Sequence, residues 1–144
     1  MTPKTDNRTV GGRFEQEMSH RLSLAGFWVH VFQQNRYGQP ADLIAAKGNY
    51  HTLIDCKACE EFEFPFSRVE ENQKFAMKTF FRKAGELCYF ALRLPDGQIR
   101  MISMSRIEQL EGRGKKRLFK EDFERETRSL ESWVEMVNAL SKEI

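Results

Sequence analysis

The order of helix-like and strand-like segments is the feature of this chain that most constrains its fold. An amphipathic helix precedes three strand-sized runs, and a second amphipathic helix is followed by further strands. The predicted segments are a helix over about 12–25, strands over 27–34, 41–46 and 50–57, a helix over 69–84, strands over 87–94 and 99–104, and then helices. This succession predicts an α/β fold whose αβββαβ core has a mixed central sheet flanked by helices.

The length of the chain fits one domain. Its 144 residues are enough to bury a sizeable core. Residues 1–10 are polar and are expected to form a disordered tail, and residues 11–144 are expected to form a single domain with a C-terminal helical extension from about 104. The longest apolar runs are strand-sized and have charges nearby, so we expect a cytoplasmic protein without a membrane segment.

Each predicted helix has one apolar face. These faces are formed by Phe14, Met18, Leu22 and Ala25 in the first helix, by Val69, Ala76, Met77, Phe80 and Ala84 in the second, and by Leu130, Trp133, Val134, Val137 and Leu140 in the last. Such spacing is typical of helices that pack on a core, and the last helix could instead pack on a partner.

Two acidic residues and a lysine stand in neighbouring strand-like runs. Asp42 precedes Asp55 by thirteen residues, and Lys57 follows two positions after Asp55. Side chains alternate along a strand, so Asp55 and Lys57 are expected on one face and Cys56 on the other. Two carboxylates can bind a divalent metal, and a lysine beside them can steady a water or a developing phosphorane charge. The alternative is a charge pair on an exposed sheet face.

Two helical residues could complete such a site. Glu15 lies beside the apolar face of the first helix, where its carboxylate could turn toward a metal or remain solvated in the first turn. Gln73 falls on the apolar face of the second helix, four residues after Val69. A buried amide needs hydrogen-bond partners, which a metal-bound water, a phosphate or the backbone could provide.

The pattern of Pro40, Asp42 and Asp55-Cys56-Lys57 resembles the PD-(D/E)XK nuclease superfamily. Within it, the chain looks most like RecU-type Holliday-junction resolvases. The matching stretches are Gly11-x-x-Phe14-Glu15, Asp42, Asp55-x-Lys57, Phe64-Pro65-Phe66 and Asn72-Gln73. The chain departs from that pattern at Pro40, where the family has threonine, and at Asp55, where glutamate is usual. The short segment between the first two strands leaves no room for the family's stalk insertion.

The resemblance implies a restriction-endonuclease-like fold and a site with defined roles. Asp42, Asp55 and Gln73 would be associated with Mg²⁺, for which Mn²⁺ could substitute. Lys57 would stabilise the transition state, and Glu15 would belong to the active-site shell. The backbone carbonyl of Cys56 is a further candidate ligand, because it lies between two site residues.

We therefore expect a Mg²⁺-dependent DNA endonuclease that acts as a Holliday-junction resolvase in recombination or repair and is encoded by a bacterium or a phage. The alternatives are a nuclease for other branched or nicked DNA and a non-catalytic DNA-binding module of the same fold.

The net charge of +2 is too small for purely electrostatic DNA binding, so local basic surface is expected to contact the phosphates. The candidates are Arg36, Lys74, Lys78, Arg113, Lys115, Lys116 and Arg117. A homodimer is expected, because two symmetric cuts need two sites related by a twofold axis. The alternating Phe62, Phe64 and Phe66 either cover the core or form that dimer contact.

Cys56 and Cys59 form a C-x-x-C motif without a second pair. We interpret Cys56 and Cys88 as small buried groups rather than as zinc ligands.

Overall fold

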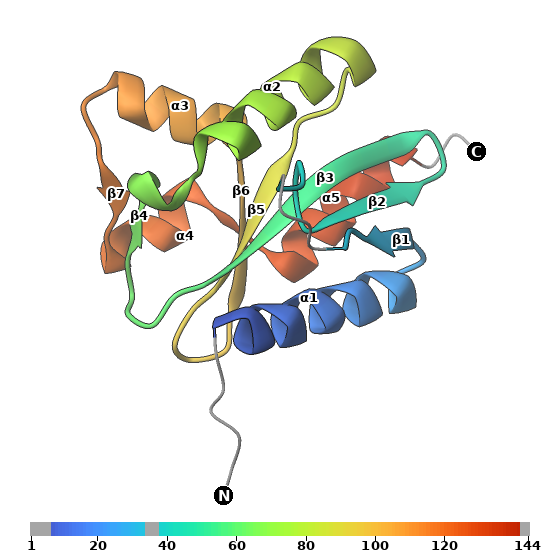
Figure 1. Ribbon diagram of the computed structural model, residues 1–144, viewed down its shortest axis with the longest axis horizontal. Coiled ribbons are helices and arrows are strands. Elements are labelled where there is room, and N and C mark those ends of the chain that lie inside the picture. The colour runs from blue at the N-terminus through green and yellow to red at the C-terminus, as the bar shows by residue number, and fades with distance from the viewer. Residues whose placement is uncertain (1–6, 34–37, 142–144) are drawn as a thin grey trace, which may run out of the picture.

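The computed structural model is a six-stranded sheet covered by helices on both faces (Figure 1). It describes the backbone of residues 7–33 and 38–141, and the side chains from residue 12 onward within those ranges. Helices α2 and α3 lie on one face of the sheet, and α1 and α5 lie on the other (Figure 1). The predicted mixed α/β architecture is confirmed.

The sheet has the strand order β1-β2-β3-β5-β6-β8. Its strands are β1 (Trp28–Val31), β2 (Leu43–Lys47), β3 (Tyr50–Ala58), β5 (Tyr89–Arg93), β6 (Ile99–Ser103) and β8 (Arg128–Ser129). Only β3 and β5 run parallel, with Ile54 opposite Tyr89, and the other neighbours are antiparallel. A parallel pair needs a crossover connection, and helix α2 (Glu71–Ala84) provides it.

Two apolar cores cover the two faces of the sheet. Helix α1 (Asn7–Leu24) packs Phe14, Met18 and Leu22 into one core, as its apolar spacing predicts. Helix α5 (Leu130–Ser141) adds Trp133 and Val137 to the same core. On the opposite face, α2 and α3 (Met104–Gly112) contribute Met77, Ile107 and Leu110, among other residues.

The chain after β6 wraps back over the segment that follows β3. Strand β7 (Arg117–Leu118) pairs with β4 (Phe64–Pro65) in a second, two-stranded sheet. The 3-10 turn η1 (Phe66–Arg68) follows β4, and η2 (Lys120–Asp122) and α4 (Phe123–Glu126) lead into β8. The C-terminal extension is therefore not only helical, because it contributes one strand to each sheet.

Three details differ from the sequence-based expectations. Helix α1 begins at Asn7, inside the segment 1–10 for which a disordered tail was predicted. Phe64 and Phe66 are buried in the protein's own core, so the dimer-contact interpretation is wrong for these two residues, while the half-buried Phe62 packs against the same core. Asp42 stands immediately before β2 rather than within it. No helix of the described chain is long and apolar enough to cross a membrane.

Candidate active site

Asp42 and Asp55 meet at the point where β2 begins beside β3. Leu43 pairs with Ile54, so Asp42 and Asp55 flank the same position of the sheet. The N–H of Asp42 donates to the carbonyl of Ile54, and the N–H of Cys56 donates to Oδ2 of Asp42 at 2.7 Å. Asp42 is 8% exposed and Asp55 only 1%. The sheet thus holds two carboxylates side by side in a largely buried position.

Lys57 and Gln73 both contact Asp55. The Nζ of Lys57 lies 3.1 Å from Oδ2 of Asp55, as expected for two side chains on one face of a strand. The Nε2 of Gln73 donates to Oδ1 of Asp55 at 2.9 Å. Cys56 points to the opposite face and packs against the core beneath α1. The structure therefore brings together three of the predicted site residues through direct contacts.

The amide of Gln73 is held in a defined orientation by the start of α2. The N–H of Glu70 donates to Oε1 of Gln73 at 3.4 Å, within a capping box in which the Glu70 side chain accepts from the N–H of Gln73. Its amide oxygen thus faces the backbone, while its N–H group faces the site. In this orientation Gln73 positions Asp55 and does not offer its oxygen to a metal.

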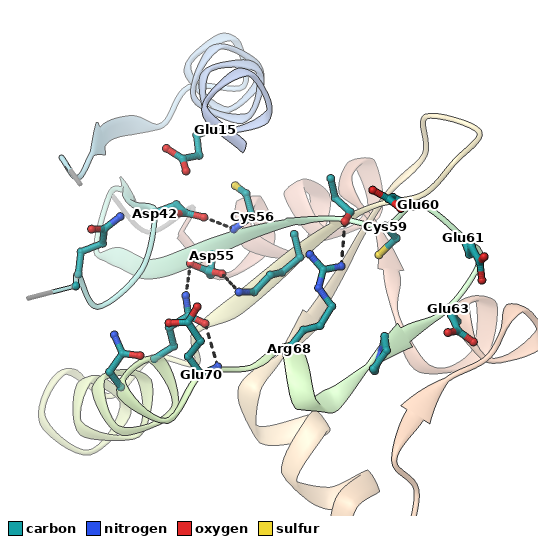
Figure 2. Close-up of a pocket in the computed structure, with 17 residues that line it drawn as sticks. Glu15, Asp42, Asp55, Cys56, Cys59, Glu60, Glu61, Glu63, Arg68 and Glu70 are labelled. Carbon is teal, nitrogen blue, oxygen red and sulfur yellow. Dashed lines mark hydrogen bonds and ion pairs between the residues drawn. The ribbon is translucent and has the colours of Figure 1, made fainter. Parts of the chain in front are cut away.

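Glu15 reaches the site from α1. Figure 2 shows its carboxylate turned toward Asp42, and the two side chains are close enough to share a hydrogen bond. Three carboxyls from a helix, a loop and a strand therefore converge. The half-buried position of Glu15 agrees with its predicted place beside the apolar face of the helix.

The clustered carboxyls raise one another's proton affinity. Burial, followed by the charge of Asp42, raises the pKa of Asp55 to about 7, although Lys57 acts in the opposite direction. Burial and the charge of Glu15 raise the pKa of Asp42 to about 6, against the hydrogen bond from Cys56. The pKa of Glu15 is also raised, mainly by burial. A cation at this position would relieve the repulsion that raises these pKa values.

The site opens into a groove of about 760 Å³. Its described lining includes seven carboxylates, which are Glu15, Asp42, Asp55, Glu60, Glu61, Glu63 and Glu70. Within the described lining, only Lys57 and Arg68 are basic. Figure 2 shows the acidic side chains spread along the groove from α1 to β4. A phosphodiester could approach such a surface only with added positive charge.

The donor set fits a hard divalent cation. Across residues 12–33 and 38–141, no three His, Cys, Asp or Glu side chains are arranged to hold a metal ion together. A metal here would rest on Asp42 and Asp55, with backbone, water or DNA oxygens as further ligands. That ligand set is the one Mg²⁺ usually takes, because it keeps several waters and binds one or two carboxylates plus substrate phosphates.

The predicted DNA-binding residues do not line this groove as far as the structure describes it. Arg36 lies outside the described residues. Four others form ion pairs within the chain: Lys74 with Glu111, Lys78 with Glu108, Lys115 with Asp122 and Arg117 with Glu63. Arg113 and Lys116 are exposed. Exposed ion pairs contribute little free energy, so the lysines and arginines in exposed pairs remain candidates for phosphate contact. Lys115 is the exception, because its partner Asp122 is buried.

Sequence reasoning missed two contributors to the groove. Glu70 caps α2 and holds Gln73, and Arg68 reaches into the groove from η1. Gln73, three residues after Glu70, fits the second half of the capping-box pattern, but that pattern has Ser, Thr, Asp or Asn at the N-cap. Arg68 has no comparable local signal.

The fold and the carboxylate–lysine site together define a nuclease of the PD-(D/E)XK superfamily. A family model described as archaeal Holliday junction resolvase (Hjc) matches residues 6–140. The chain belongs to this family. It is thus a DNA endonuclease that acts as a junction resolvase in DNA recombination and repair.

A solved structure shows the same fold. It is Hjc, a Holliday junction resolvase from the archaeal hyperthermophile Archaeoglobus fulgidus, with a TM-score of 0.69 and 22% identity. The match covers 86% of this chain and 99% of that chain. A comparison with curated proteins finds no match. The superfamily assignment is confirmed, whereas the closer likeness to RecU-type enzymes and the bacterial or phage origin receive no support from these comparisons.

Proposed function

We propose that this resolvase cuts DNA with Mg²⁺ held between Asp42 and Asp55, and that Mn²⁺ can replace it. The observation that carries the proposal is the contact of Asp55 with both Lys57 and Gln73, beside Asp42 and at the floor of an open groove. The Cys56 carbonyl is proposed as a further ligand. When bound, the metal would stabilise charge on the attacked phosphate and acidify a water.

Three further side chains of the site have separate roles in the proposed cleavage. Lys57 orients the attacking water and neutralises charge that develops at the phosphorus. Gln73 holds Asp55 through its amide N–H, so that the carboxylate keeps a single orientation. Glu15 lies beside Asp42 and supports the site either through that carboxylate or through a water.

We also propose that the enzyme acts as a homodimer, because a four-way junction is resolved by two symmetric cuts. The large apolar side chains that the described part of the chain exposes are Leu24, Trp28, Phe75, Phe81, Phe119 and Leu140. Light scattering after gel filtration measures the mass directly, and a monomer in the presence of junction DNA would contradict the dimer.

The test of the proposed function is cleavage of a labelled four-way junction in Mg²⁺, Mn²⁺, Ca²⁺ and EDTA. We expect cleavage in Mg²⁺ and Mn²⁺, binding without cleavage in Ca²⁺, and no cleavage in EDTA. Flap, nicked and linear duplexes of the same sequence serve as matched substrates and should be cut more slowly. Equal cleavage in EDTA would contradict the metal assignment, and tightly bound stoichiometric zinc would redirect it to Cys56 and Cys59.

A further inference from the structure

Arg68 is a basic side chain in the groove that the proposed chemistry does not use. It ends the turn η1 after β4, and it lines the same groove as Asp42, Asp55 and Lys57. Figure 2 shows the side chain extending across the groove toward the end of β3. It is therefore a basic group in the same groove as the carboxylates.

The guanidinium of Arg68 is held in place without a charged partner. Its Nη1 donates to the carbonyl of Ala58 at 2.9 Å, and its Cζ lies 5.8 Å from the centre of the Phe64 ring. No carboxylate of the described chain forms an ion pair with it, although Glu60, Glu61 and Glu63 line the same groove. A guanidinium has five N–H donors, so most of them remain available for a ligand.

The charge balance of the groove indicates what that ligand is. Of the two basic side chains in the described lining, Lys57 is paired with Asp55 and is only 12% exposed. DNA that enters among seven carboxylates needs positive charge beyond a metal at Asp42 and Asp55. Arg68 supplies a fixed fork of donors, and this geometry suits a phosphate better than a flexible ammonium does.

We propose that Arg68 binds a backbone phosphate next to the scissile one, on the strand that enters the groove. This inference rests on the proposed function, because it assumes that the strand is cut at Asp42 and Asp55. Arg68 binds the DNA strand and fixes its position along the groove, while the attacked phosphate contacts Lys57 and the metal. The hydrogen bond to Ala58 and the Phe64 ring orient the guanidinium before DNA arrives, which reduces the entropy lost on binding.

The test measures binding of a fluorescent four-way junction to full-length protein by anisotropy in Ca²⁺, over a series of salt concentrations. Single-turnover cleavage in Mg²⁺ at saturating protein gives the chemical rate. The variants are Arg68→Ala, Arg68→Gln and Arg68→Lys, and Arg82→Ala is the matched control. Arg82 is exposed on α2, and its side chain contacts Thr79.

Arg68→Ala should weaken junction binding at least about fivefold and lower the log–log salt slope by about 0.9, the value for one lost phosphate contact. The saturating cleavage rate should stay within about threefold of wild type, and Arg82→Ala should change neither quantity. Arg68→Lys keeps the charge, so it should keep the salt slope while losing part of the affinity.

Arg68→Gln separates DNA binding from a structural role. The bond that Arg68 donates to Ala58 is exposed, so its loss should change thermal stability little, while junction binding falls as in Arg68→Ala. Wild-type affinity and salt slope in the glutamine variant would overturn the proposal and leave Arg68 as a structural link to β3. A lost saturating rate with unchanged affinity would also overturn it. Absence of cleavage by wild-type protein would instead contradict the proposed function.

Discussion

The candidate active-site groove and the C-terminal segment 115–129 both bury charged side chains, but the charges are balanced in opposite ways. In the groove, the carboxyls of Glu15, Asp42 and Asp55 cluster, and the pKa of each is raised. In the C-terminal segment, burial raises the pKa of Asp122, but Lys115, the N–H of Phe119 and Arg125 outweigh it and lower the pKa overall.

Arg100 is a buried cation whose charge is likewise compensated, here by hydrogen-bond acceptors of the C-terminal segment. It is 7% exposed, its Nε donates to Oγ1 of Thr127, and its Nη2 donates to the carbonyls of Phe123 and Thr127. These bonds attach the C-terminal segment to β6. Buried carboxyls therefore have a lowered pKa where cations and N–H donors surround them, and a raised pKa where further carboxyls surround them.

The largest effect should come from removing the site's charged groups. Asp42→Asn, Asp55→Asn and Lys57→Ala should each slow cleavage at least about 1,000-fold, or about 4 kcal/mol of transition-state stabilisation. Folding and junction binding in Ca²⁺ should persist, because the two cores do not depend on these residues. Single-turnover assays measure the cleavage rate, and circular dichroism measures folding. Asp96→Asn in the β5–β6 turn is the matched control. Unfolding of all three variants would make these residues structural.

The opposite result is expected for Arg100→Met. The side chain keeps a similar length, but the carbonyls of Phe123 and Thr127 lose their donor. We expect a loss of about 3 kcal/mol in the free energy of unfolding, which corresponds to about 10 °C in Tm. Cleavage at 25 °C should stay within about twofold. Wild-type stability in this variant would show that the hydrogen bonds of the buried Arg100 do not stabilise the fold.

Gln73→Ala tests whether the amide matters to catalysis. It should cost at least about tenfold in cleavage, or about 1.4 kcal/mol, because Asp55 loses the N–H that orients it. Tm should change little, since the groove leaves room for water in place of the amide. Gln73→Glu is a second variant for comparison. It keeps the size of the side chain but adds a carboxylate to the cluster of Glu15, Asp42 and Asp55. A wild-type rate in Gln73→Ala would show that Gln73 acts only as part of the helix cap.

The smallest effect is the pH dependence of stability without metal. Asp55 and Asp42 have folded pKa values of about 7 and about 6, both above the ordinary 3.8. Their protonated forms therefore contribute stability below about pH 4, which is lost as pH rises through 6 to 7. In EDTA, Tm should fall between pH 5 and pH 8, and the Asp42→Asn/Asp55→Asn double variant should show a smaller fall. A rise in wild-type Tm over this range would contradict the repulsion inferred for the site.

Those parts of the site that depend on local periodicity could be predicted from the sequence. Alternation along a strand places Asp55 and Lys57 on one face, and the structure joins them in an ion pair. The spacing of Phe14, Met18 and Leu22 likewise marked the buried face of α1. Both inferences succeed because the geometry of one element is set by neighbouring residues in the chain.

How separate elements meet could not be predicted from the sequence and depends on the packing of the whole fold. This packing turned the amide of Gln73 toward Asp55, and it brought Arg68 into the groove. It also added the two-residue strand β8 to the sheet and bonded Arg100 to Thr127 beside it. Two-residue strands carry no periodic signal, and a side chain's partner across the fold depends on packing between distant segments. The residue types were visible in the sequence, but their partners were set by the packing of the two cores.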